Sequence, residues 1–151
     1  MYLSRQQIAD EPGEKKTHFL NPQAQRLNIS LGDLVGLKSL GVHIITVEPG
    51  HFTTEHHFHH AEEEAIYVLS GTAIATIGDN EFEIKEGDFL GFPTNGIAHS
   101  IFVNGSEPLR CLVVGNRLAF DACDYPRQGK RLYRHNGKWD LVELDAVTKV
   151  K

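Results

Sequence analysis

The chain has 151 residues, with 15 lysines and arginines against 20 aspartates and glutamates and a formal net charge of −5. This length suits one domain with its own core, and the interspersed charges exclude a basic face for nucleic acid or an anionic membrane. No run approaches the roughly 20 apolar residues that span a bilayer, and the N-terminus lacks a signal-peptide core. We therefore expect a cytoplasmic protein with a single domain over residues 1–151 and a small-molecule ligand.

Residues 1 to 25 are polar and contain the breakers EPGEKK and NPQ. Proline and glycine punctuation of this kind favours turns over regular elements. The segment predicts an N-terminal arm of extended chain or short turns.

Residues 40 to 116 consist of short β-branched or aromatic runs separated by turn residues: GVHIITV, EAIYVLS, TAIATIG, EFEIK, DFLGF, HSIFV and LRCLVVG. In EFEIK, Phe82 and Ile84 alternate with charged residues, the pattern of a strand with one wet face. The residues Gly78, Asp79 and Asn80 before it indicate a hairpin turn. Many short strands without a long helical period predict an all-β sandwich or barrel.

Residues 117 to 151 lack an apolar run that could form a second core. They predict a C-terminal extension that packs on the barrel through Tyr125, Tyr133 and Trp139 and ends in a short helical turn. Cys111 and Cys123 lack CxxC spacing and are expected to be free structural thiols. The basic segment favours a solvated face, with contact to an anionic substrate or a partner acid as the alternative; it contains Arg127, Lys130, Arg131 and Arg134.

The sequence EHHFHHAEEE at residues 55–64 concentrates histidines and glutamates. Residues two apart on a strand share a face, so His57 and His59 are expected to point together into the barrel. Glu64 starts the next strand, and His99 starts a later one after a Pro/Gly turn. Three imidazoles and one carboxylate suit a divalent transition metal such as Zn, Mn, Fe or Ni and leave coordination positions open.

Alternatives exist for the neighbouring polar residues. His56 and His60 have the opposite parity and are expected at the surface or rim, although a slip of one residue would exchange His56 for His57. Glu62 and Glu63 are expected to be solvated, with Glu63 replacing Glu64 as ligand if the hairpin is shorter.

Two segments resemble the motifs of the cupin family. PGHFTTEHHFHHAEEEAIYVLSG resembles the first motif, and GDFLGFPTNGIAHSIFVN resembles the second, with an extra residue between Pro93 and Gly96 and with Asn104 one residue late. The matching positions are Gly50, His57, His59, Glu64 and Gly71, then Gly87, Pro93, Gly96 and His99. The resemblance is to small single-domain bacterial cupins. It implies a jelly roll, or double-stranded β-helix, with a barrel core at about residues 40–116, and more often a homodimer than a monomer.

A metal with open positions predicts an enzyme that acts on a small oxygen-rich substrate. Sugar or sugar-phosphate isomerase or epimerase chemistry and an iron-dependent dioxygenase are both open, as is a non-catalytic protein that binds or senses a sugar. The sequence offers no clear general base and no phosphate-binding glycine loop. Candidate pocket residues are Tyr67, Phe89, Phe92 and Ile101, although such residues are more often core.

Overall fold

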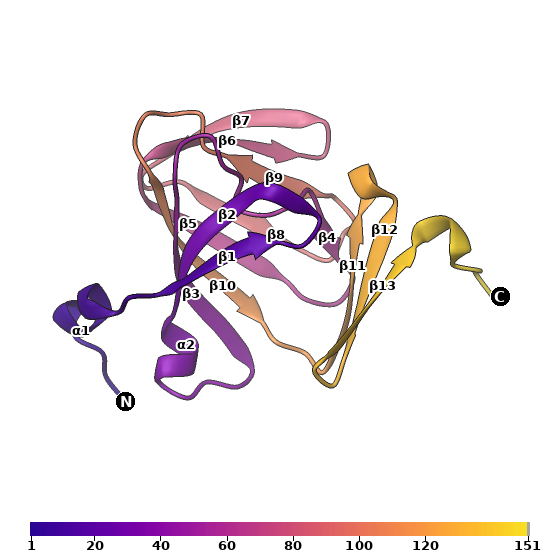
Figure 1. The fold of residues 1–151 in the computed structure, drawn as a ribbon, viewed down its shortest axis with the longest axis horizontal. Coiled ribbons are helices and arrows are strands. Elements are labelled where there is room, and N and C mark those ends of the chain that lie inside the picture. Colours follow the sequence, from indigo (N-terminus) through magenta and orange to yellow (C-terminus); the bar gives the residue numbers. More distant parts are fainter. Residues whose placement is uncertain (151) are drawn as a thin grey trace.

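The computed structural model describes residues 1–150 and is built mainly of antiparallel strands (Figure 1). A six-stranded sheet has the order β1-β2-β3-β10-β5-β8, a three-stranded sheet β7-β6-β9, and a four-stranded sheet β13-β12-β11-β4. This arrangement is a jelly roll, so the predicted all-β class is confirmed. Within residues 1–150 no helix is both long and apolar enough to cross a membrane.

The seven apolar runs form β3 and the strands from β5 to β10. Their bounds are Leu40–Val47, Glu64–Ser70, Thr72–Ile77, Asn80–Lys85, Phe89–Phe92, His99–Phe102 and Leu109–Asn116. The predicted hairpin turn is present, but Asn80 already belongs to β7 and pairs with Ile77, so Gly78, with a φ of 59°, and Asp79 alone form the loop. In the edge strand β7, Ile84 is buried in the core, whereas Phe82 is half exposed.

The main core lies between the six-stranded and three-stranded sheets. Its fully buried members include Val47, Val68, Ile101, Leu109 and Cys111. Strand alternation explains the selection: Ile66 and Val68 of β5 face this core, whereas Tyr67 between them is exposed.

The predicted N-terminal arm is only partly correct, because residues 5–30 contain regular elements. A capping box at Ser4 and Gln7 starts helix α1, Arg5–Asp10. Strands β1, Glu14–His18, and β2, Asn21–Ser30, then form a hairpin that joins the large sheet through β3, and α2, Leu31–Leu34, follows. The β2 strand has polar inward residues, which is why its sequence lacks the usual apolar alternation.

The C-terminal extension also consists of strands. The bounds of the strands and turns are Phe120–Tyr125 for β11, Pro126–Gln128 for η1, Lys130–His135 for β12, Lys138–Glu143 for β13 and Leu144–Ala146 for η2. Strand β11 pairs with the two-residue strand β4, Phe58–His59, in the register Cys123 opposite His59. The predicted short final turn is present as η2. Tyr125 is buried as predicted, but Trp139 on the outermost strand β13 is 59% exposed.

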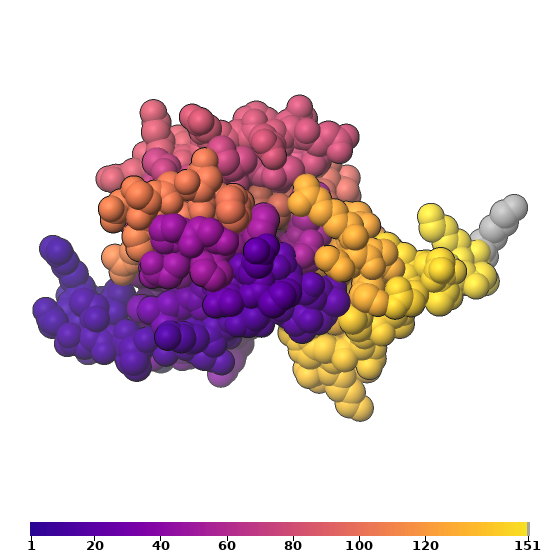
Figure 2. Space-filling model, turned by 45° about the horizontal axis from the view of Figure 1, so that its top comes forward, coloured from indigo at the N-terminus to yellow at the C-terminus, as the bar shows by residue number. Residues whose placement is uncertain are grey.

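The N-terminal hairpin and the C-terminal strands meet at one place. The tip of the β1–β2 hairpin lies against the C-terminal strands in the space-filling view (Figure 2). The rings of His18 and Phe19 pack on Tyr125 with centroid separations of 5.3 and 5.8 Å. These contacts close one side of the barrel mouth.

Candidate metal centre

His57, Glu64 and His99 lie together at the barrel mouth. His57 and His99 exchange two backbone hydrogen bonds of 3.0 and 2.8 Å, which bring the loop before β4 beside the start of β9. Glu64 starts β5, and its Oε2 lies 3.2 Å from Nε2 of His99. One ligand atom from each of these three residues lies within 4.8 Å of the others.

Hydrogen bonds fix the orientation of two histidine rings. Nδ1 of His57 donates to the backbone carbonyl of Glu55 at 2.8 Å, which leaves the lone pair of Nε2 for a metal. Nδ1 of His59 donates to Oδ2 of Asp121 at 2.5 Å, so Nε2 is again the free nitrogen. Partners of this kind hold the rings of metal-binding histidines in position.

The fourth predicted ligand, His59, lies beside this group. Its ring centroid is 5.1 Å from that of His57. His59 belongs to two other groups in which the possible ligand atoms lie within 4.8 Å of one another. One group contains His57 and Cys123, and the other contains Glu62 and Asp121. The structure thus brings three of the four predicted ligands into one cluster and places His59 next to it.

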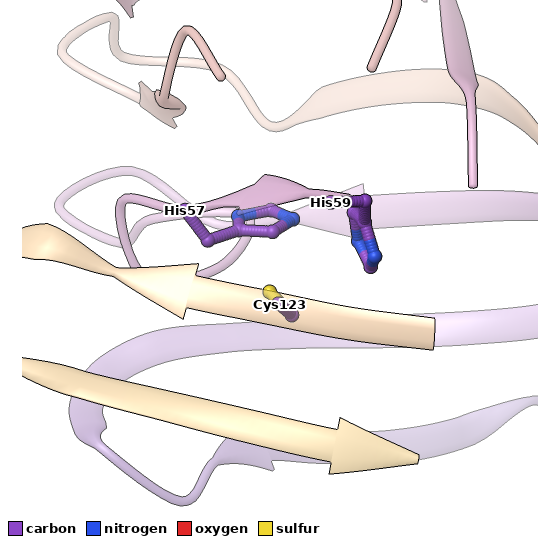
Figure 3. Close-up of side chains that lie close together, drawn as sticks. All are labelled: His57, His59 and Cys123. Atoms are coloured by element: carbon purple, nitrogen blue, oxygen red, sulfur yellow. The ribbon is translucent and has the colours of Figure 1, made fainter. Parts of the chain in front are cut away.

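Cys123 points from β11 toward the rings of His57 and His59 (Figure 3). Its position follows from the pairing of β11 with β4, which sets Cys123 opposite His59. Both cysteines are free and buried, as predicted. Burial raises the pKa of the Cys123 thiol to about 12, so the thiol is protonated at neutral pH.

The charge state of the group suits a cation. Burial and the nearby His99 lower the pKa of His57 to about 3, so this imidazole is neutral at pH 7. Burial opposes ionisation of Glu64, but the hydrogen bond from His99 and the surrounding histidines hold its pKa at about 2. Burial also disfavours protonation of His59, but the hydrogen bond and charge of Asp121 outweigh it and raise the pKa of His59.

These donors fit a divalent transition metal. Neutral imidazole nitrogens and a carboxylate oxygen are the ligands that Mn, Fe, Ni and Zn take in proteins. The cluster of buried nitrogens around one ionised carboxylate therefore could bind such an ion.

Two predictions for neighbouring residues are wrong. His56 is buried, 6% exposed, with Nδ1 3.1 Å from the hydroxyl of Ser100. Glu62 is also buried, and it accepts hydrogen bonds from Arg134 and from the backbone N–H of Leu118. The strand β4 has only two residues, so strand parity does not extend to residue 56 or 62. His60 and Glu63 are exposed as predicted.

The four pocket candidates are also placed elsewhere. Tyr67 and Phe89 are cross-strand partners on the outer face of the large sheet, where they are 44% and 67% exposed. Phe92 and Ile101 belong to the core, which was the alternative to a place in the pocket. The ring of Phe92 stacks on His99 with the centroids 3.5 Å apart.

A cavity of about 450 Å³ opens at the cluster of His57, Glu64 and His99, which we call the metal cluster. The four predicted pocket residues do not line this cavity. Polar side chains from the N-terminal hairpin, β3, β10 and the C-terminal strands form much of its wall. They include Lys16, His18, Arg26, Asn28, His43, Arg117, Tyr125 and Arg134. Lys16 and His18 were missed because residues 1–25 looked like an arm, and Arg26 and Asn28 because the strand that follows has no apolar alternation. The alternation of Ala24, Arg26 and Asn28, now seen on the inward face of β2, was the available signal.

The basic C-terminal segment mainly contacts partner acids. Arg131 makes two hydrogen bonds to Asp124, of 2.5 and 2.8 Å. Lys130 pairs with Glu143, and Arg134 pairs with Glu62. Of the four basic residues, Arg134 alone lines the cavity of about 450 Å³.

Comparison with known proteins identifies the family of this fold. The family model of the cupin domain matches residues 43–115. A crystal structure from Acidithiobacillus ferrooxidans, named "Putative sugar phosphate isomerase", is 51% identical and covers 99% of this chain and 96% of that chain with a TM-score of 0.97. A cupin from Silicibacter pomeroyi, named as a sugar phosphate isomerase, shares the fold at 22% identity and a TM-score of 0.81, over 92% and 93% of the two chains.

An uncharacterised protein of Methanocaldococcus jannaschii is 33% identical over 70 residues, 46% of this chain and 48% of that protein. The chain thus spans about half the length of this relative. A jelly roll with histidines and a carboxylate at its mouth defines a class of barrels able to bind metal. Within that class, the chain belongs to the cupin superfamily.

Proposed function

We propose that the protein is a metal-dependent isomerase that acts on a small, oxygen-rich, anionic substrate of the sugar phosphate type. The observation that carries the proposal is the cluster of His57, Glu64 and His99 in the wall of a cavity of about 450 Å³ whose lining also includes several arginines. The name of the relative from A. ferrooxidans, which matches nearly the whole chain at 51% identity, supports this reaction class.

In this proposal His57, Glu64 and His99 hold one divalent transition metal, and His59 is the fourth ligand through Nε2. The bound ion supplies Lewis acidity toward a carbonyl or hydroxyl oxygen of the substrate. The protein contributes a buried site in which Glu64 is ionised and His57 is neutral, so neither residue has to lose a proton at neutral pH before the ion binds.

Isomerisation also moves a proton between adjacent carbons and needs a residue that can exchange it. His18, His43 and Glu62 line the cavity outside the cluster of three ligands. Nδ1 of His18 accepts a 3.2 Å hydrogen bond from the backbone N–H of Leu20, so the neutral ring carries its proton on Nε2 and can donate to a substrate oxygen. The carboxylate of Glu62 is held by Arg134, and we propose it as the base.

Metal content and proton exchange test this proposal. The protein is purified, reconstituted with Mn, Fe, Ni or Zn, and analysed for bound metal beside the His57→Ala, His99→Ala double variant. The His135→Ala variant is the matched control, because His135 is a surface histidine paired with Asp140. Wild type and control should hold one ion, and the double variant should hold none.

Aldose and ketose phosphates are then followed by NMR in deuterated water. Isomerisation with deuterium incorporation at the reacting carbon, lost in Glu62→Gln, is the expected result. A wild type that binds no metal contradicts the proposal. Metal and sugar binding without turnover would instead support a non-catalytic sugar binder, and iron-dependent oxygen uptake would support a dioxygenase.

A further inference from the structure

Arg26 stands out among the cavity residues because its charge lacks an ion-pair partner. Nη1 donates to the backbone carbonyl of Thr53 at 2.5 Å. Nε is buried and has no hydrogen-bond partner among residues 1–150. Arg26 also forms no ion pair with any carboxylate in the described chain. A buried donor left unpaired is costly to the folded protein, so this arrangement calls for an explanation.

The other arginines of the cavity are neutralised. Arg117 donates to Asp33 at 2.5 Å, and Arg134 pairs with Glu62. Lys16, the direct cross-strand partner of Arg26, contacts Glu14 at 3.1 Å, and both of these side chains are well exposed. Arg26 is therefore the arginine of this cavity whose charge no carboxylate pairs within residues 1–150, and Lys16 lies opposite it in an exposed pair that water screens.

We propose that Arg26, assisted by Lys16, binds the anionic group, a phosphoryl or carboxyl group, of a ligand whose remaining oxygens face the metal cluster. This inference rests on the proposed function and specifies where its substrate is held. A guanidinium donates directional hydrogen bonds to planar or tetrahedral oxyanions. An oxyanion would supply the acceptor that Nε lacks.

Glu64 and Arg26 line the same cavity, so we expect Glu64 to couple an ion bound at the cluster of His57, Glu64 and His99 to the anion site. The negative charge of Glu64 acts on Arg26, and it favours the protonated guanidinium that burial disfavours. A cation bound at Glu64 cancels that charge and so raises the affinity of the site at Arg26 for an anion. Metal and anion therefore bind with positive cooperativity, and each raises the affinity for the other by the same factor.

A purely structural role for Arg26 is the competing explanation, because Nη1 anchors the loop that contains Thr53. Such a role predicts loss of stability without any change in anion affinity. Arg26→Gln and Arg26→Lys separate the two roles, and Arg110→Gln is the matched control because Arg110 is exposed on β10.

The experiment measures binding of inorganic phosphate, and separately of acetate, by calorimetry to metal-free and metal-loaded protein. Phosphate should bind wild type and Arg110→Gln equally, and more tightly once metal is present. Arg26→Gln should lower the affinity for phosphate by roughly tenfold or more, the effect of one charge-assisted hydrogen bond. Arg26→Lys should retain part of that affinity. Preference for acetate over phosphate would identify a carboxylate ligand.

Unchanged phosphate and acetate affinity in folded Arg26→Gln, or no anion binding by wild type, overturns the inference. If Arg26→Gln fails to fold, Arg26→Lys decides, because a lysine that binds phosphate as tightly as arginine excludes the guanidinium contact. Metal-free protein that binds phosphate through Arg26 upholds the anion site even if no metal is found. In that case the proposed function alone would fail.

Discussion

Asp121 on β11 accepts a 2.5 Å hydrogen bond from Nδ1 of His59 on β4, although 62 residues separate the two in sequence. The second oxygen of Asp121 accepts the backbone N–H of Ala61 at 3.0 Å. The carboxylate thus fixes both the ring of His59 and the chain that follows it. Asp121 is 8% exposed, and in the proposed metal site it would be the partner that orients His59.

Asp121→Asn should weaken metal binding by about 10- to 100-fold, the range found when partners of metal-binding histidines are changed. Asparagine has one acceptor oxygen for two donors and no charge to hold the ring. Competition with a chromophoric chelator measures the affinity. Asp140→Asn is the control, because it removes a 2.6 Å His135–Asp140 contact at the surface. Equal metal affinities in the two variants would show that Asp121 does not support the site.

His18 should make the protein less stable in acid. Burial, with the charge of Arg26, lowers the pKa of His18 from 6.5 to about 4. Between these values the unfolded chain binds more protons than the folded one, so stability is full above pH 6.5 and falls as the pH drops toward 4. The loss due to this partly exposed residue is about 1 kcal/mol after screening. Urea unfolding at several pH values, with a chelator present, should show a shallower pH dependence for His18→Gln, and an unchanged dependence would refute this assignment.

Cys123 should not bind the metal as a thiolate at neutral pH. Burial raises the pKa of its thiol to about 12 in the metal-free protein, so an ion would have to displace that proton, whereas Glu64 is already ionised and offers an oxygen ligand nearby. The cobalt-substituted protein should therefore lack a thiolate-to-cobalt charge-transfer band. Cys123→Ala and the control Cys111→Ala, which removes the other buried thiol, should both retain one ion. A band that disappears only in Cys123→Ala would show that the sulfur is a ligand.

Phe92 and Phe89, two positions on the same strand, should differ sharply in their contribution to stability. Phe92 is 8% exposed and stacks on His99, whereas Phe89 is 67% exposed. Phe92→Ala should lower the free energy of unfolding by about 3 to 5 kcal/mol. Phe89→Ala should change it by less than about 0.5 kcal/mol. Chemical denaturation of both variants measures the difference, and similar losses would contradict the assigned orientation of β8.

The barrel strands and the cluster of His57, Glu64 and His99 could be predicted because their signals are local. Alternation and turn residues located β3 and the strands from β5 to β10, and spacing selected His57, Glu64 and His99. The burial of His56 and Glu62 could not be read the same way, since residues 55–63 form an irregular loop with a strand of two residues.

The partners of the site depend on pairing between distant segments. Asp121 and Cys123 reach His59 because β11 pairs with β4, which no local pattern reveals. Arg26 was missed because an inward strand face that borders a polar cavity has no apolar alternation to detect. The site residues that were missed are those whose position depends on long-range strand pairing or on facing a cavity. Errors in secondary structure mattered less.

Much of the cavity wall comes from outside the part of the chain that carries His57, Glu64 and His99. His57, Glu64 and His99 lie within residues 43–115, the part shared with the cupin domain model. Arg26 and His18 precede this part, and Arg117, Tyr125 and Arg134 follow it. Ligand preference should therefore be adjustable by grafting a different N-terminal hairpin onto an unaltered barrel, whereas any exchange of the C-terminal strands has to keep Asp121, which holds the ring of His59.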